Sequence, residues 1–149
     1  MSREKLNKKT LLVVEDSLVC QALIKAFLKN TGAIVIMTGT GEEALEAFKN
    51  HKIDLVITDL RLPGTSGITL IRNIKYNYPG TPVIVQTASN IDFSEADCID
   101  AGCDSYITKP YSRSLFIDSI IRLLEKKNHP ERKYPKMIRK DGKFLQPLI

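Results

Sequence analysis

Five short apolar runs recur along the chain, and a segment in which apolar residues have helical spacing follows each of them. The runs cover residues 10–14, 34–37, 54–58, 82–86 and 105–108. Their apolar residues are continuous and do not alternate with polar ones, which is typical of strands that helices cover on both faces. We therefore predict an α/β fold with a doubly wound, five-stranded parallel sheet and right-handed crossovers.

Capping residues mark the starts of several predicted helices. Ser17 precedes the first helix, Thr40 and Glu43 form a capping box at the second, and Ser112 precedes the last. Helical spacing gives each helix one apolar face with which to cover the sheet. The residues predicted to face the core are Val19, Leu23, Ala26 and Phe27 in the first helix and Leu115, Phe116, Ile120, Leu123 and Leu124 in the last.

Composition is ordinary for a globular protein. With 149 residues, 43% of them hydrophobic, the chain is expected to form one domain. No apolar run approaches the ~20 residues of a membrane-spanning helix, and the charged N-terminus lacks the apolar core of a signal peptide. Three cysteines without metal-ligand spacing are expected to be reduced thiols. We therefore expect a cytoplasmic protein that makes no membrane contact.

The positive charge lies at the two ends of the chain. Residues 1–9 carry a net charge of +3 and residues 126–149 a net charge of +6, whereas residues 10–125 carry −4. We predict a basic N-terminal extension at 1–9, a domain at 10–127 and a basic C-terminal tail at 128–149. An acidic body without a recognition module argues against nucleic-acid binding.

The C-terminal tail contains one local structural signal. Asp141-Gly142 lies between apolar segments and favours a hairpin turn, which would place Lys140 opposite Lys143. Like charges at opposite positions are unfavourable, and an isolated hairpin is only marginally stable. The tail is therefore either solvated and partly disordered, or an element for docking or dimerisation.

Four of the five predicted strands end in side chains that could carry chemistry, and the second ends in Thr38-Gly39, a chemically quiet pair. Glu15 and Asp16 follow the first strand, Asp59 the third, Thr87 the fourth and Lys109 the fifth. Parallel strands bring their carboxyl ends to one edge of the sheet, where ligands bind. Clustered carboxylates repel one another, and Mg²⁺ with oxygen ligands relieves that repulsion. Asp59 could then attack phosphorus to form an acyl phosphate, with Thr87 and Lys109 binding the phosphoryl oxygens.

Four motifs carry a resemblance to a known family. They are VVED at 13–16, VITDLRLPGTSG at 56–67, VQTAS at 85–89 and YITKP at 106–110. With these motifs in this order and at this spacing, the chain resembles the receiver domain of two-component response regulators over residues 10–127. The resemblance implies a flavodoxin-like (βα)5 fold for that part of the chain.

The resemblance also implies a set of residues for the chemistry. Asp59 would accept a phosphoryl group from a phosphohistidine, Lys109 and Thr87 would bind phosphate, and the bond between Lys109 and Pro110 would be cis. The partner would be a sensor histidine kinase or a histidine phosphotransfer protein. The implied Mg²⁺ ligands are Glu15, Asp16, Asp59 and the backbone carbonyl of Arg61.

By the same resemblance, further residues would serve switching and tuning. Thr87 would move toward the phosphate, and Tyr106 would turn into the space that it leaves. Arg61 and Ser89 occupy positions that tune dephosphorylation in the family.

Three functions share this chemistry. The leading hypothesis is a phospho-acceptor that signals to an unknown downstream protein by protein contact, and that catalyses only its own phosphorylation and dephosphorylation. An alternative is a phosphorelay intermediate or the receiver module of a hybrid kinase system. A less favoured reading is an aspartyl-phosphate hydrolase that resembles the haloacid-dehalogenase-like phosphatases. Those enzymes carry a second acid two residues after the nucleophile, where this chain has Arg61.

Overall fold

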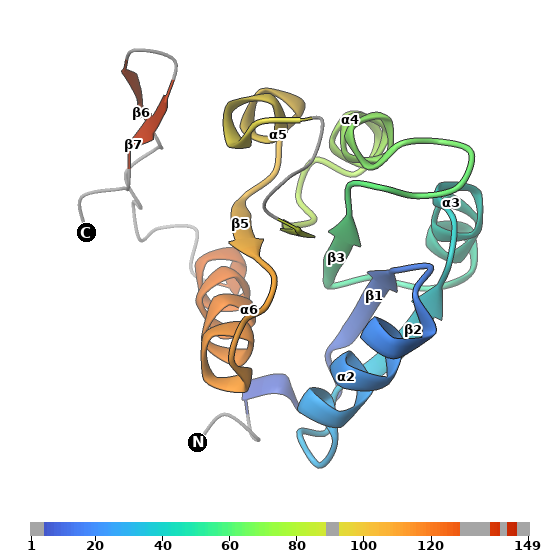
Figure 1. Ribbon diagram of the computed structural model, residues 1–149. Coiled ribbons are helices and arrows are strands. Elements are labelled where there is room, and N and C mark those ends of the chain that lie inside the picture. Colours follow the sequence, from blue (N-terminus) through green and yellow to red (C-terminus); the bar gives the residue numbers. More distant parts are fainter. Residues whose placement is uncertain (1–4, 89–92, 129–137, 141–142, 146–149) are drawn as a thin grey trace.

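The computed structural model describes residues 5–88, 93–128, 138–140 and 143–145, and its centre is one parallel sheet (Figure 1). The five strands lie in the order β2-β1-β3-β4-β5, which confirms the predicted sheet. In chain order they are β1 (Thr10–Val14), β2 (Ile34–Thr38), β3 (Leu55–Asp59), β4 (Val83–Thr87) and β5 (Ser105–Thr108). The strand order reverses beside β1, so the carboxyl ends of β1 and β3 lie at the switch point where α/β sheets bind ligands.

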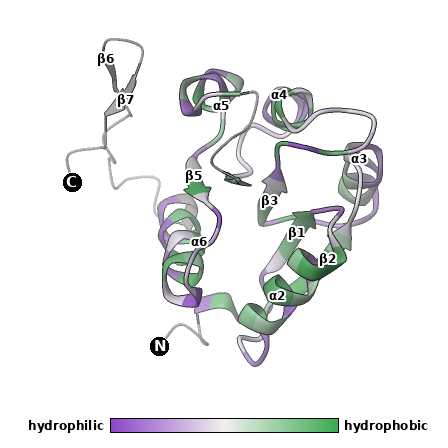
Figure 2. Ribbon diagram, viewed as in Figure 1, coloured by the Kyte–Doolittle hydropathy of each residue, from purple (hydrophilic) through white to green (hydrophobic). Residues whose placement is uncertain are grey.

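Helices cover both faces of the sheet, and two separate core clusters result. One cluster joins one face of the sheet to α3 (Gly41–Asn50), α4 (Gly67–Asn77) and α5 (Glu95–Ala101). The other joins the opposite face to α2 (Leu18–Leu28) and α6 (Arg113–Asn128). Figure 2 shows hydrophobic residues along β1, and both hydrophobic and hydrophilic residues around the helices. Burial of both sheet faces explains why the strand sequences are continuously apolar.

The inward face of α2 differs from the predicted one. Val19 is 80% exposed and Leu23 is 46% exposed, whereas Ile24 and Leu28 are buried against the sheet and α6. Ala26 is also exposed, and Phe27 is partly buried. Apolar residues surround most of this helix, so their spacing does not select one face, and packing against α6 decides it.

The last helix and the second cap each depart from prediction in one detail. Leu115 is 48% exposed, while the other predicted core residues of α6 are buried.

The Thr40 hydroxyl accepts a hydrogen bond from the Glu43 amide at 3.0 Å, as a capping residue should. The Glu43 carboxylate, however, accepts from the Gly39 amide at 2.7 Å and not from Thr40. The reciprocal half of the capping box is therefore displaced by one residue.

Two short strands follow the main domain. β6 (Ile138–Lys140) and β7 (Lys143–Leu145) pair antiparallel, with Lys140 opposite Lys143 as the turn signal predicted. The turn residues Asp141 and Gly142 lie outside the described residues. The two alternatives for the tail, a solvated segment or an element for docking or dimerisation, both stay predictions. None of the helices in the described part of the chain is long and apolar enough to cross a membrane.

Gly67 fixes the path of the loop after β3. Its amide donates to the Leu60 carbonyl at 2.9 Å, which closes the loop over residues 60–67. A methyl group at position 67 would lie 2.3 Å from the Asp59 carbonyl oxygen and 2.6 Å from the Leu60 Cα. Only glycine allows this approach, so Gly67 holds the backbone that carries Asp59.

We expect Gly67→Ala to lower the free energy of unfolding by about 1–3 kcal/mol, because the methyl group overlaps backbone atoms that cannot move aside freely. Denaturant titration measures this change. Gly80→Ala is the matched control, since nothing lies within 4 Å of a methyl group there. The control should stay within about 0.5 kcal/mol of wild type. Equal stability of the two variants would contradict the assigned role of Gly67.

Candidate functional site

The register of the sheet gathers the predicted site residues at one edge. The Glu15 amide extends the β1–β2 ladder by donating to the Thr38 carbonyl at 2.9 Å, and the Lys109 amide extends the β4–β5 ladder by donating to Thr87 at 2.7 Å. Asp59 is the last residue of β3. Residues from three strand ends therefore meet although up to 94 positions separate them in sequence.

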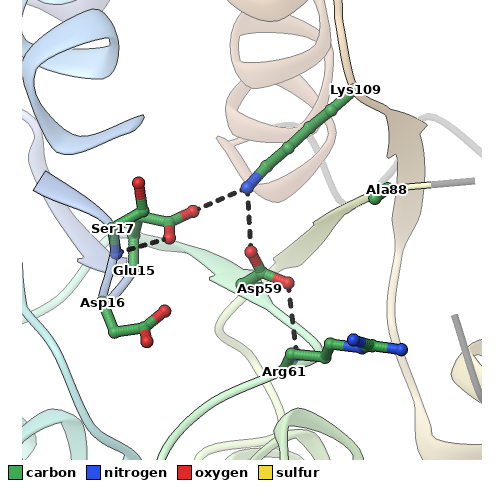
Figure 3. A pocket seen from close by; sticks show the side chains of 7 residues that line it. All are labelled: Glu15, Asp16, Ser17, Asp59, Arg61, Ala88 and Lys109. Carbon is green, nitrogen blue, oxygen red and sulfur yellow. Dashed lines mark hydrogen bonds and ion pairs between the residues drawn. The ribbon is translucent and has the colours of Figure 1, made fainter. Parts of the chain in front are cut away.

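A pocket of about 320 Å³ opens at this edge (Figure 3). Acidic, basic and hydroxyl side chains all contribute to its wall. It is lined by Glu15, Asp16, Ser17, Asp59, Arg61, Ala88 and Lys109. The pocket thus brings together both predicted acids of the β1 end, the acid of the β3 end and the lysine of the β5 end.

The Lys109 ammonium lies between two carboxylates. Its Nζ is 2.8 Å from Glu15 Oε1 and 2.8 Å from Asp59 Oδ2, and Figure 3 shows the side chain reaching across the pocket to both. Burial lowers the pKa of Lys109, but the hydrogen bonds and charges of Asp59 and Glu15 outweigh it and hold the pKa above its ordinary value. Lys109 is therefore a permanent cation at the centre of the site.

Glu15 is the most deeply buried of the three pocket acids. Its Oε1 accepts from Lys109 and, at 3.1 Å, from the Gln86 amide, while its Oε2 accepts from the Ser17 amide at 2.9 Å. Only 1% of the residue is exposed. Burial raises the pKa of Glu15 and the Lys109 hydrogen bond opposes that rise. Both carboxylate oxygens are thus already occupied by protein donors.

Asp59 turns its two oxygens in different directions. Oδ1 accepts from the amides of Leu60 at 2.6 Å and Arg61 at 3.2 Å, and Oδ2 accepts from Lys109. The loop backbone and the lysine together hold the carboxylate at the pocket floor, where the residue is 9% exposed. An oxygen fixed in this way is suited to attack an electrophile that enters the pocket.

Asp16 differs from the other two acids. It is exposed, it lines the pocket, and within the described residues its carboxylate has no hydrogen bond or ion pair. No three carboxylate, histidine or thiol side chains among the described residues are gathered closely enough to hold a metal alone. Mg²⁺ is commonly bound by one or two carboxylates with waters and phosphate oxygens, so the oxygen-only donor set of this pocket fits that ion.

The remaining predicted residues lie around the pocket or outside its wall. Thr87 is fully buried, does not line the pocket, and donates its hydroxyl to the Ala88 carbonyl at 3.3 Å. Tyr106 is partly buried against the cluster under α4 and α5, and burial raises its pKa. The Arg61 side chain points away from Lys109 in Figure 3. Ser89 lies outside the described residues.

Sequence reasoning missed two polar residues that support the site. Gln86 is fully buried in β4 and donates to Glu15, and the Tyr111 hydroxyl bonds to the same Gln86 side chain. The available signal was a glutamine inside an apolar strand sequence, which requires a buried polar partner. The expected cis bond between Lys109 and Pro110 is present.

Comparison with known proteins identifies relatives of the whole domain. The sequence model of the response regulator receiver domain matches residues 11–121. The regulatory protein VanR of Enterococcus faecium is 37% identical over 103 residues, which make up 68% of this chain and 43% of VanR. The chain therefore spans less than half the length of that relative.

Solved structures share the fold along nearly their full length. The receiver domain of a sensor histidine kinase from Pseudomonas aeruginosa, with a magnesium ion coordinated in its active-site cleft, is 28% identical with a TM-score of 0.73. The match covers 79% of this chain and 98% of that one. A co-crystal structure of the Saccharomyces cerevisiae histidine phosphotransfer protein Ypd1 with the receiver domain of its response regulator Ssk1 matches at 25% identity and a TM-score of 0.73. That match covers 82% of this chain and 92% of the other.

Lys109→Met tests the electrostatics of the pocket. Without the ammonium, Glu15 and Asp59 repel each other, so the variant should lose about 1–3 kcal/mol of stability in the absence of divalent ions. Added Mg²⁺ should then raise the melting temperature more in the variant than in wild type, because a stronger negative potential attracts the cation.

Lys75→Met is the matched control for that experiment. Lys75 pairs with Asp104 at 2.6 Å and is similarly buried, at 19% exposed against 22% for Lys109, but it does not line the pocket. It should lose stability, but Mg²⁺ should raise its melting temperature only as much as that of wild type, because its pocket is intact. The same response to Mg²⁺ in both variants would refute the electrostatic account of the pocket.

Proposed function

This chain belongs to the response regulator receiver domain family, and on that premise we propose that it accepts a phosphoryl group on Asp59 from a phosphohistidine. One observation carries the proposal: a single ammonium, that of Lys109, is shared between Asp59 and Glu15 inside a solvent-open pocket. From this position, the Lys109 ammonium can release a carboxylate and bind an incoming anion without moving across the pocket.

The proposed step forms one bond and breaks one. An Asp59 carboxylate oxygen bonds to phosphorus, the P–N bond to the donor imidazole breaks, and the imidazole keeps the electron pair and takes a proton from solvent. Lys109 then binds a phosphoryl oxygen. Thr87 binds another after its hydroxyl leaves the Ala88 carbonyl. The acyl phosphate formed on Asp59 is the signalling state.

We assign the Mg²⁺ ligands unequally. Asp16 has a carboxylate that no described residue engages, and we propose that Asp59 and the Arg61 carbonyl complete the direct oxygen donors. Glu15 is more deeply buried than Asp59, at 1% against 9% exposed, so we assign it the part of holding Lys109 and adding negative potential. When bound, Mg²⁺ supplies neutralisation of the charge that phosphoryl oxygens bring to the acids.

The proposed donor is a sensor histidine kinase or a histidine phosphotransfer protein in the cytoplasm. In the complex of Ypd1 with Ssk1, a histidine phosphotransfer protein is bound to a receiver domain that has this fold. We place the receiver domain at residues 10–127, between a basic extension and a basic tail. The chain covers 43% of VanR, so the comparison does not extend to the response that follows phosphorylation. We propose that a protein partner recognises the phosphorylated state.

Phosphorylation is proposed to act through Thr87 and Tyr106. Thr87 is buried and turned toward Ala88, and Tyr106 packs partly buried in the adjacent core cluster. When Thr87 moves to the phosphoryl group, it vacates space into which the Tyr106 ring can turn. The phosphoryl charge thereby shifts the population between two side-chain packings. Arg61 and the undescribed Ser89 would tune how long the acyl phosphate lasts.

The acceptor assignment predicts a modification that depends on one residue. Acetyl phosphate with Mg²⁺ should add one phosphoryl group to wild type, detected as a mass increase that hydroxylamine removes, as expected for an acyl phosphate. Asp59→Asn should remain unmodified because the amide is a poor nucleophile. Asp118→Asn, an exposed acid on α6, is the control and should be modified like wild type. A phosphoryl group retained by Asp59→Asn would overturn the assignment.

The switch predicts a change at Tyr106 that other tyrosines do not share. In protein labelled with fluorotyrosine, beryllofluoride with Mg²⁺ should shift the Tyr106 resonance, which Tyr106→Phe identifies by its disappearance. Tyr76 is 87% exposed and serves as the internal reference that should not move. The Asp59→Asn variant should abolish the shift. An unchanged Tyr106 resonance in wild type, under conditions where beryllofluoride binds, would remove Tyr106 from the switch.

A further inference from the structure

Gln86 is a fully buried amide that the proposed phosphoryl transfer does not use directly. It pairs with Asp59 across β3 and β4, and paired residues in a parallel sheet place their side chains on the same face. Its Nε2 donates to Glu15 Oε1 at 3.1 Å. Gln86 therefore lies beside both the proposed acceptor and the acid that shares its lysine.

The hydrogen bonds around Gln86 have a defined direction. A carboxylate only accepts, so the amide nitrogen must face Glu15 and the amide oxygen must face Tyr111. The Tyr111 hydroxyl therefore donates to Gln86 Oε1. Burial raises the pKa of Tyr111 to about 12, so the hydroxyl keeps its proton and remains a donor. A chain of hydrogen bonds thus runs from Tyr111 through Gln86 to Glu15.

The Tyr111 ring anchors the outer end of this chain. It stacks on Phe116 of α6 with ring centroids 5.4 Å apart, and it lies 6.2 Å from the Phe27 ring of α2. Phe116 is fully buried, so this aromatic cluster is part of the core. A ring held on two sides keeps its hydroxyl, and through it the Gln86 amide, in one orientation.

We propose that Gln86, oriented by Tyr111, is a positioning residue for the phosphoryl-accepting site. The inference rests on the proposed function. When Lys109 turns from Glu15 to an incoming phosphoryl oxygen, the buried Glu15 carboxylate keeps two neutral donors, the Gln86 amide and the Ser17 backbone amide. Without Gln86, Oε1 of that carboxylate would lose its second donor, and leaving Glu15 would cost Lys109 more. Gln86 therefore makes the lysine available to the anion.

This role predicts a selective loss of anion binding. Gln86→Met keeps the length of the side chain and removes both hydrogen bonds. At saturating Mg²⁺, beryllofluoride affinity and the rate of modification by acetyl phosphate should each fall about tenfold, as when an outer support of a site is lost. Mg²⁺ affinity, measured by calorimetry without any phosphodonor, should change less than about twofold, because the Gln86 amide hydrogen-bonds to Glu15 and Tyr111 and to no proposed direct ligand.

Tyr111→Phe provides a second variant that keeps the ring and its stacking. Removing the hydroxyl should weaken beryllofluoride binding about fivefold, the ratio expected for one ordinary hydrogen bond. The double variant should bind no more weakly than Gln86→Met, because Tyr111 acts only through Gln86. Tyr78→Phe is the control: Tyr78 stacks on Phe48 away from the pocket, and its variant should bind like wild type.

Three results would overturn the inference. Wild-type affinity for beryllofluoride in both Gln86→Met and Tyr111→Phe would do so, whatever their melting temperatures. Equal weakening of Mg²⁺ and beryllofluoride would indicate general loosening of the site instead of positioning. Failure of wild type to bind beryllofluoride at all would overturn the proposed function together with this inference. The first of these results, if binding still requires Asp59, would refute this inference alone.

Discussion

The contact of one ammonium with two buried carboxylates is the constraint from which the rest of the site follows. Lys109 lies 2.8 Å from both Glu15 and Asp59, and the three residues come from the ends of β5, β1 and β3. Carboxylates withdrawn from water are costly unless a cation and hydrogen-bond donors receive them. Lys109 follows β5, which lies at the edge of the sheet, so the site is complete only where β1, β3 and β5 are all in place.

The side chains that line the pocket carry more negative than positive charge. Three carboxylates face a single lysine that contacts two of them, and Asp16 has no partner among the described residues. A divalent cation and an anionic phosphoryl group complement each other in such a place, since each reduces the charge that the other creates. Neutral donors from Ser17 and Gln86 also reach Glu15, and on our proposal they keep it hydrogen-bonded when Lys109 turns to an anion.

Sequence patterns predicted the fold and most of the pocket because both depend on local signals. Continuous apolar strands gave the sheet, and the residues just after each strand gave Glu15, Asp16, Asp59 and Lys109. The face of α2 was wrong because apolar residues surround that helix, and its packing partner α6 lies about 90 residues away. Gln86 and Tyr111 were missed because their importance arises from a contact between distant segments, which no local periodicity records.

The glycine at position 67 has a consequence for protein engineering. Its close approach to the backbone of Asp59 and Leu60 makes residues 59–67 a closed unit whose length and curvature are fixed. A designer who grafts this proposed acceptor onto another parallel sheet must transfer the strand end, the loop and the first helical residue together. Moving the aspartate alone would leave its Oδ1 without the two loop amides that orient the carboxylate.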